Sequence, residues 1–222
     1  MSSTEKITTY TEMVALIRKI GFLPYLGKGF ALPSVQELTD NEWHDNNEET
    51  DPWKWRVRIA ETNEIAYSKV FSKKSGFIHR DWIAEFLSVR RGEQTVDDFY
   101  ETGSLSQAAK SIYALFSPRK ILATHEIKAL ANFGSQDKTR FENGMNELMM
   151  KMYLTTRGLR LIIGANGEPH SWPSTAYSTM EDWYGSAIPK VDVHEAEEKI
   201  RERILQFNPQ ADAKQILKLI RP

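Results

Sequence analysis

The sequence contains no cysteine, so a disulfide bond, a thiolate metal site and a cysteine nucleophile are all excluded. It has no run of 18 apolar residues that could span a membrane, and its N-terminus lacks the basic and apolar regions of a secretory signal. A glycine-rich phosphate loop and a Gly-x-Ser-x-Gly nucleophile motif are also absent. From these absences we expect a cytoplasmic protein without a membrane partner.

Histidines are few and far apart. The five that the chain has do not follow the spacing of a metal site: His44, His79, His125, His170 and His194. We therefore expect neither a metal nor a cofactor, and no small-molecule ligand. An internal repeat is not visible in the sequence either.

The charges that are present are unevenly distributed. The chain has 222 residues and a net charge of −1, and 41% of its residues are hydrophobic, enough for a sizeable core. Residues 40–51 include six acids and no lysine or arginine, whereas residues 54–91 include nine bases and four acids. An acidic loop thus precedes a basic segment, and a basic segment suits contact with phosphate.

Residues 1–92 predict an N-terminal helical region with an irregular loop and a basic segment. A Thr-x-x-Glu capping box begins a helix that ends at Gly21. Residues 22–50 have no clear period and predict a long irregular connection. Partial alternation over residues 64–72 indicates a strand, and a helix is expected over residues 81–91.

The pair Asp51-Pro52 predicts a helix start, because aspartate accepts free N–H groups of a first turn and proline fits the first helical position. Two tryptophans, Trp53 and Trp55, follow, and a structural interpretation buries both indoles. The alternative is a functional edge, where a carboxylate activates water and an indole stacks on a nucleobase. The carboxylate candidates are Glu48, Glu49 and Asp51.

Residues 104–180 predict a winged helix-turn-helix module. Three short helices are expected, with caps at Ser104, Thr124 and Ser135. Two β-rich runs follow, and the Asn166-Gly167 pair between them is a strong hairpin signal. Three helices followed by a hairpin is the winged-helix order.

Residues 181–222 predict a C-terminal helical extension, with one helix over residues 193–207 and another from Pro209 to Ile220. The chain as a whole is therefore expected to be mainly α with a small β content, an α+β fold with flanking helices around the winged-helix core. The three regions either fold separately or form one compact unit.

A winged helix places its third helix in the major groove of DNA, and its hairpin touches the backbone or minor groove. The nucleic-acid-binding candidates are cations of the third helix, the wing and the basic segment: Lys54, Arg56, Lys73, Lys74, Arg80, Lys138, Arg140, Arg157 and Arg160. Acids offset the cations of the third helix, and winged helices also dock proteins. A protein partner that binds the methionine-bearing helix is therefore an open alternative.

Cations and aromatic rings alternate over residues 68–82, "SKVFSKKSGFIHRDW". Such a run suits binding of single-stranded nucleic acid or of an extruded base, because aromatic rings stack on bases while cations contact phosphates. The structural alternative is a strand–loop–helix junction with solvated lysines and buried rings.

Six strings resemble, in the same order, a family of small bacterial proteins related to AlkZ. They are "ETDPWKWR", "GFIHRDW", "LSQAAKSIY", "LATHEIK", "LMMKMYLT" and "WPSTAYSTMEDWYG", and they cover nearly the whole chain. AlkZ proteins are DNA glycosylases built from tandem winged helices. The resemblance implies a winged-helix architecture and a surface that holds DNA.

The AlkZ catalytic signature is a Gln–aliphatic–Gln triplet, and this sequence does not contain one. The resemblance therefore carries no catalytic residue over to this chain. The sequence favours a nucleic-acid-binding protein of undefined role, with a divergent base-excision glycosylase and a protein-interaction module as alternatives. Whether the chain is an enzyme stays open at this point.

Overall fold

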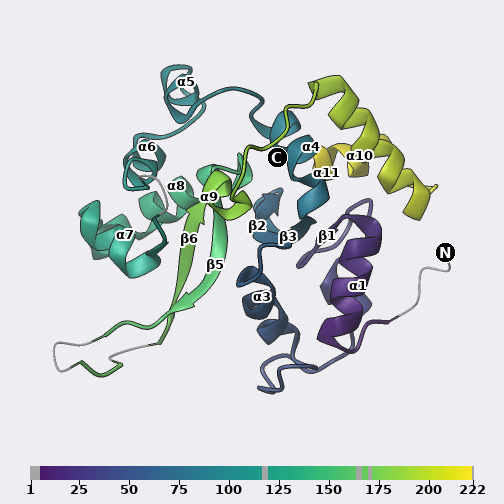
Figure 1. Cartoon of the computed structure of the whole chain (residues 1–222), viewed down its shortest axis with the longest axis horizontal. Coiled ribbons are helices and arrows are strands. Elements are labelled where there is room, and N and C mark those ends of the chain that lie inside the picture. Colours follow the sequence, from purple (N-terminus) through teal and green to yellow (C-terminus); the bar gives the residue numbers. More distant parts are fainter. Residues whose placement is uncertain (1–5, 117–119, 164–166, 170–171, 222) are drawn as a thin grey trace.

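The computed structural model of the chain describes residues 6–116, 120–163, 167–169 and 172–221. The fold is α+β, with helices around two small antiparallel sheets (Figure 1). This confirms the predicted fold class. No helix in the described ranges is both long and apolar enough to cross a bilayer.

The first sheet belongs to a unit that we call the first unit. Its order is helix, strand, helix, helix, strand, strand. The elements are α1 (Tyr10–Ile20), β1 (Phe22–Pro24), α2 (Val35–Leu38), α3 (Pro52–Ala60), β2 (Ile65–Phe71) and β3 (Lys74–His79). The last strand, β3, lies in the middle and pairs antiparallel with both β1 and β2.

Two of these strands were not expected from the sequence. β1 interrupts the predicted irregular connection, and β3 replaces the predicted junction that leads into a helix. The β2–β3 turn consists of Ser72 and Lys73, which have φ values of +47° and +65°. Positive φ at both central residues is the geometry of a type I′ hairpin turn, here without the usual Asn or Gly signal. The predicted helical N-terminal region therefore contains a three-stranded sheet.

A connection of short helices leads to the second sheet. It contains η1 (Arg80–Trp82), α4 (Ile83–Arg90) and α5 (Val96–Glu101). The predicted helix over residues 81–91 is thus a 3₁₀ turn followed by α4.

The unit that we call the second unit has the element order of the first, apart from the 3₁₀ turn η2 that leads directly into its third helix. Its elements are α6 (Gln107–Tyr113), β4 (Leu122–Ala123), α7 (Thr124–Leu130), η2 (Ser135–Asp137), α8 (Lys138–Met150), β5 (Leu154–Arg160) and β6 (Ser174–Thr179). Its last strand, β6, again lies in the middle, between β4 and β5. The sequence shows no repeat, but the structure repeats a six-element order and a strand order.

The hairpin predicted after the third helix is present, because β5 and β6 pair antiparallel and a bridge joins Ile163 to Pro169 farther out. Asn166, expected at its tip, lies outside the described residues. The three predicted caps of this unit differ from the structure: Ser106 rather than Ser104 caps α6, Ala123 rather than Thr124 precedes α7, and Asp137 rather than Ser135 precedes α8.

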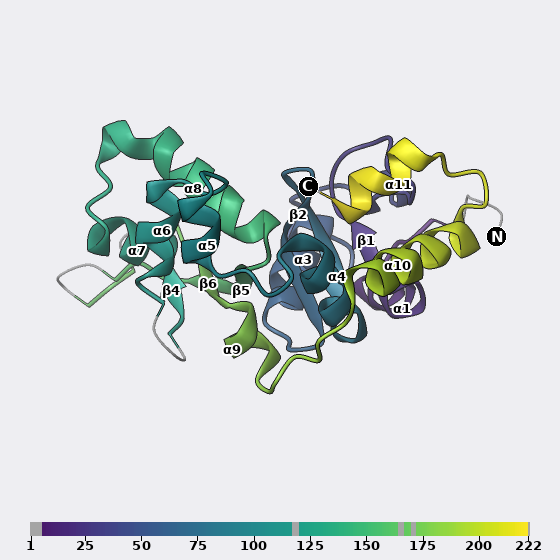
Figure 2. The same cartoon turned by 90° about the horizontal axis from the view of Figure 1, so that it is seen from above.

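The C-terminal helices complete the first unit rather than the second. α9 (Met180–Tyr184) follows β6, and α10 (Val193–Phe207) and α11 (Ala213–Ile220) come next. Asp192 caps α10 as predicted, whereas α11 begins after Asp212 and not at Pro209. Both helices pack on α4, and α11 also touches β2, at the end of the molecule opposite α7 (Figure 2).

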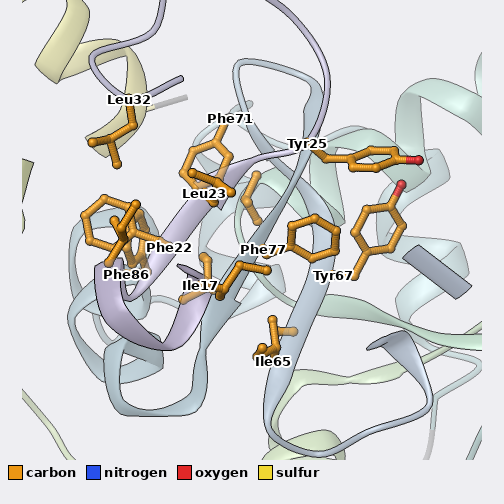
Figure 3. Packing of buried hydrophobic residues seen from close by; sticks show 14 of the residues in the cluster. Ile17, Phe22, Leu23, Tyr25, Leu32, Ile65, Tyr67, Phe71, Phe77 and Phe86 are labelled. Atoms are coloured by element: carbon orange, nitrogen blue, oxygen red, sulfur yellow. The ribbon is translucent and has the colours of Figure 1, made fainter. Parts of the chain in front are cut away.

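Buried side chains form two hydrophobic cores. The larger contains the first unit, α4, α10 and α11, and the smaller contains α5 and most of the second unit. Aromatic rings fill the larger core, where Phe22 meets Phe86 and Tyr25 meets Phe77 edge to face (Figure 3). Edge-to-face pairs add about 0.5–1.5 kcal/mol each beyond the area that they bury.

The two units meet in a reciprocal contact. α3 of the first unit touches β5 of the second, and α8 of the second touches β2 of the first. Where β2 meets β5, the Ser68 hydroxyl donates to the Leu154 carbonyl and the Thr155 hydroxyl donates to the Tyr67 carbonyl, each at 3.3 Å. A buried polar seam therefore joins two apolar cores and fixes how the units sit together.

Candidate nucleic-acid interface

The start of α3 is organised by the carboxylate of Asp51, which is fully buried. It accepts backbone N–H groups from Trp53 at 2.8 Å, His44 at 3.0 Å and Asn46 at 3.3 Å. These bonds compensate the burial of a charged group. The sequence predicts the helix cap, and the structure adds that the same side chain holds the loop before it.

The other two carboxylate candidates lie on the surface and contact cations of α3. Glu48 is 3.6 Å from Lys54, and Glu49 is 2.6 Å from Arg58. The Arg58 guanidinium also lies over the Tyr10 ring at 3.9 Å. In this arrangement Lys54 and Arg58 each have a neighbouring carboxylate, so their charge is partly neutralised before any anion arrives.

Trp53 and Trp55 have different environments. The Trp55 side chain is fully buried in the larger core, and its indole N–H donates to the Glu49 carbonyl at 2.9 Å. Trp53 is 39% exposed. Of the two stacking candidates, only Trp53 therefore presents its ring to an incoming base.

Arg56 lies over Trp53, with its guanidinium carbon 3.5 Å from the ring centroid. No ion pair with Arg56 occurs within the described part of the chain, and its buried Nε has no hydrogen-bond partner there. Burial raises the pKa of Tyr67, while hydrogen bonds from the side chains of Ser75 and Arg56 lower it. Arg56 is thus a cation without a carboxylate beside a partly exposed indole.

The lysines of the β2–β3 turn lie away from this group. Lys73 and Lys74 are exposed, and the adjacent Ser72 hydroxyl donates to the Lys218 carbonyl of α11 at 3.3 Å. The turn therefore lies beside the C-terminal helix, and the basic run over residues 68–82 does not form one continuous surface with α3.

Arg80 and Arg157 come together, although 76 positions separate them in the sequence. Arg157 donates to the Asn63 side chain at 2.6 Å, and Arg80 donates to the Asn63 carbonyl at 3.3 Å. Arg80 also lies over the Tyr184 ring at 3.9 Å. Burial lowers the pKa of Arg157, and the charge of Asp182 opposes this effect. A basic pair thus forms where the root of the β5–β6 hairpin meets the first unit.

Arg160 lies farther along β5. Its guanidinium donates to the Ile121 carbonyl at 3.0 Å and to Glu126 at 2.7 Å. Burial raises the pKa of Glu126, but the Ala123 N–H and Arg160 outweigh it, so the net shift is downward. Next to this pair, His125 Nδ1 is 2.6 Å from the Ser174 hydroxyl.

The third helix of the second unit, α8, is exposed along its N-terminal half. Lys138, Arg140 and Asn143 are exposed there, and Arg140 is 3.3 Å from Asp137. The C-terminal half is covered instead: Lys69 of β2 donates to Asn146 at 3.0 Å. Only the first turns of α8 are therefore exposed enough to enter a groove of DNA.

The β5–β6 hairpin projects from the body of the molecule (Figure 1). We call its described residues 159–163, 167–169 and 172–173 the outer ribbon. Leu159, Leu161 and Ile163 are each 43–56% exposed there, and Trp172 is 89% exposed. The sequence analysis did not select this apolar group. Every second residue over 159–163 is apolar and exposed, as in a strand with one apolar face. The sequence could have indicated this face only if it had also shown that the strand extends beyond the hydrophobic core here.

The methionines of α8 offer little open surface to a protein partner. Met145 and Met149 are buried in the smaller core, and Met150 is half-buried. Two surface cavities lie elsewhere, one of about 670 Å³ between α10 and α11 and one of about 640 Å³ between residues 91–97 and α6. None of the predicted site residues lines either cavity.

The fold and this surface define an α+β protein with two repeated units, a polar third helix and a projecting ribbon. Residues 7–221 match the model of the AlkZ-related family, so the chain belongs to that family. This confirms the resemblance found in the sequence.

No curated protein matches the chain. Among solved structures, the chain is similar to the DNA glycosylase AlkZ of Streptomyces sahachiroi, with 8% identity and a TM-score of 0.47. The match covers 92% of this chain and 57% of that one, so the chain spans a little over half the length of the protein it matches.

Proposed function

We propose that the chain is a DNA-binding protein and that its second unit is a winged helix. The observation that carries this proposal is the order of α6, β4, α7, α8, β5 and β6, with β6 between β4 and β5. This is the helix–strand–helix–helix–strand–strand arrangement of a winged helix, in which the third helix meets the major groove.

The exposed side chains support the same orientation. In helix-turn-helix proteins the N-terminal residues of the recognition helix contact base edges, and the N-terminal half of α8 is the part that is open. Lys138 and Arg140 suit phosphate or guanine there, and Asn143 suits adenine. Arg157 and Arg160 lie along the hairpin, where a wing reaches the sugar-phosphate backbone.

Membership in the AlkZ-related family also supports the proposal, because AlkZ itself is a DNA glycosylase. The six-element order of the first unit fits the tandem arrangement. We therefore describe the chain as glycosylase-related in fold and without the Gln–aliphatic–Gln triplet.

Binding without catalysis is the function that the geometry favours. A water-activating base needs a lone pair directed at solvent or substrate. The oxygens of Asp51 accept three backbone N–H groups, and Glu48 and Glu49 face cations of α3. Asp51 is therefore not placed as a base, and Glu48 and Glu49 are surface carboxylates that pair with cations.

The test is fluorescence anisotropy with a labelled duplex over a range of salt concentrations. We expect the affinity to fall steeply with salt, because cations that contact phosphate release counterions. The double variant Arg157→Ala/Arg160→Ala should lower the slope of log affinity against log salt by about 1, mainly through Arg157, because Glu126 lies 2.7 Å from Arg160 and already offsets its charge. The double variant Arg157→Lys/Arg160→Lys should keep most of the slope. Binding that does not depend on salt, or no binding at all, would overturn the proposal.

A further inference from the structure

The first unit presents an aromatic pair to solvent that winged-helix binding by the second unit does not use. His44 is exposed and Trp53 is 39% exposed, and their ring centroids are 4.6 Å apart. The rings are tilted by 48°, so they do not stack in parallel. A large indole kept at the surface next to a second ring is a feature that burial in the core does not explain.

The backbone that holds this pair is strained. His44 has a φ of +72° and Asn46 a φ of +67°, values that non-glycine residues seldom adopt. The buried Asp51 carboxylate fixes both residues by accepting their N–H groups. Because the same carboxylate accepts the Trp53 N–H, one side chain sets the position of both rings. The pair is thus preorganised, and a ligand does not have to order it on binding.

The charge beside the pair is positive and lacks a carboxylate. Arg56 lies 3.5 Å over the Trp53 ring and makes no ion pair with the described residues. Its neighbours Lys54 and Arg58, on the same helix, do contact carboxylates. The Nε of Arg56 is buried and the side chain hydrogen-bonds Tyr67, so the guanidinium is held in place over the indole. A ring next to a guanidinium is the combination that binds a nucleobase and its phosphate together.

The position of the pair relates it to the second unit. α3 touches β5, the strand that carries Arg157, so the aromatic pair and the wing belong to neighbouring elements. The charge of Arg56 also reaches β6: burial raises the pKa of Tyr177, hydrogen bonds from Thr124 and Thr175 lower it, and Arg56 lowers it further. α3 therefore borders the strand that carries Arg157, one of the residues proposed to contact DNA (Figure 1).

We propose that Trp53, with His44 and Arg56, forms a stacking site for an unpaired nucleobase of DNA that the second unit holds. The base would lie on the exposed part of the indole that Arg56 and His44 leave uncovered, and the positive charge of Arg56 would attract the phosphate next to it. The substrate class is then duplex DNA with an extrahelical base rather than fully paired duplex. This inference rests on the proposed DNA binding and names the form of DNA that the first unit recognises.

The experiment compares two labelled probes that differ in one feature. One is a fully paired duplex, and the other is the same duplex with a single extrahelical adenine. Wild-type protein should bind the second probe at least several-fold more tightly. Base–aromatic stacking contributes about 1–3 kcal/mol per base, so Trp53→Ala should lower affinity for the extrahelical probe by roughly 5- to 150-fold and remove the preference. Trp53→Phe should keep most of it.

Trp172→Ala is the matched control, because Trp172 is also an exposed indole but lies on the outer ribbon. It should leave the ratio of the two affinities unchanged. Circular dichroism and chemical denaturation establish that each variant is folded. A second variant, Arg56→Met, keeps the length of the side chain and should also reduce the preference.

The outcomes separate the two proposals. Equal wild-type affinity for both probes, or equal losses on both probes with Trp53→Ala, would overturn the stacking site and leave DNA binding standing. If neither probe binds, the proposed function fails and the stacking site fails with it. A preference that Trp53→Ala removes and Trp172→Ala keeps supports the site.

Discussion

The two units share one order of elements but differ in what they expose. In the first, a two-residue turn closes the β2–β3 hairpin, and α4, α10 and α11 cover the unit. In the second, the hairpin continues into the outer ribbon, with a tryptophan that is 89% exposed. The comparison shows that one topology can serve mainly as a core or mainly as a contact surface, depending on hairpin length and on what packs against it.

The third helices show the same division. α3 packs on the larger core through the fully buried Trp55, and its opposite side carries Trp53 and Arg56. α8 buries Phe141, Met145 and Leu148, and its first turns are polar and open. We therefore assign the groove contact to α8 and the aromatic contact to α3, and each assignment can be tested by substitution.

The largest effect is expected at Trp55. Trp55→Ala should lower the free energy of unfolding by about 3–5 kcal/mol, because a fully buried indole is lost and a cavity remains. Trp53→Ala, two positions away, should cost less than about 1 kcal/mol. Urea denaturation followed by circular dichroism measures both. Similar losses for the two variants would contradict the division of α3 into an anchored side and an exposed side.

A glycine in the sheet of the first unit gives the next effect. A Cβ added at Gly76 would lie 2.3 Å from a ring carbon of Phe71 and 2.9 Å from the Leu23 carbonyl oxygen. Gly76→Ala should therefore destabilise the fold by about 1–3 kcal/mol through overpacking.

The matched control for this change lies in the second unit. At Gly134, where φ is −80°, an added Cβ meets only Asp137 at 3.7 Å. Gly134→Ala should leave the melting temperature nearly unchanged. A larger loss at Gly134 than at Gly76 would mean that the first unit is the more loosely packed of the two.

Some helix caps could be predicted from the sequence, although those expected at Ser104, Thr124 and Ser135 lie at other residues. Thr9, Asp51, Thr95 and Asp192 cap helices as the sequence indicates, because a side-chain oxygen at the N-cap satisfies N–H groups that have no partner inside the helix. The spacing of Phe141, Met145 and Leu148 likewise marks the buried face of α8. These signals are local, so one sequence is enough to read them.

The sheet of the first unit could not be read in the same way. β1 has only three residues, and all three are buried, so no alternation marks it. β3 contains Gly76, and its turn has no glycine or asparagine. β1 exists because it pairs with β3, which lies far away in the sequence, whereas β3 also pairs with its neighbour β2 across the two-residue turn. The two units repeat the order of their elements and strands but not their residues, so the repeat becomes visible only in the paired sheets.

The candidate site was predictable residue by residue but not as a surface. The sequence suggested Trp53, Arg56 and Arg157, and it could not show that Arg80 meets Arg157 at Asn63. Nor could it show that Lys73 and Lys74 lie beside α11. Contacts between residues that are far apart in the chain depend on how the units pack, and that packing rests on the seam between β2 and β5.

Alkaline pH should affect the second unit through Tyr153. Burial raises the pKa of Tyr153 to about 12, although the charge of Arg91 opposes the shift, and its hydroxyl donates to the Gln94 carbonyl at 2.6 Å. The folded state therefore retains this proton more strongly than the unfolded state, whose pKa is about 10. The stability linked to Tyr153 is present below pH 10 and is lost as the pH rises to about 12.

Tyr153→Phe tests this. At neutral pH the variant should have a free energy of unfolding about 1 kcal/mol lower than that of the wild type, because one hydrogen bond is lost. Between pH 10 and 12 its free energy of unfolding should decline less steeply than that of the wild type. Denaturation curves at several pH values provide the measurement. Parallel declines in wild type and variant would show that other groups account for the alkaline sensitivity.

The smallest effect concerns the groove contact assigned to α8. Lys138→Ala should reduce the salt slope of duplex binding by about 1, because it removes an exposed cation from the first turn of α8. Arg140→Ala should reduce the slope less, because Asp137 lies 3.3 Å from that arginine and offsets its charge. Lys54→Ala on α3 is the matched change, and it should reduce the slope less, since Glu48 lies 3.6 Å from that lysine and already offsets its charge. The measurement is anisotropy titration of a fully paired duplex, so the stacking site on α3 does not contribute. If Lys54→Ala changed the slope and the α8 variants did not, the roles of the two third helices would be reversed, and the first unit would be the one that meets the groove.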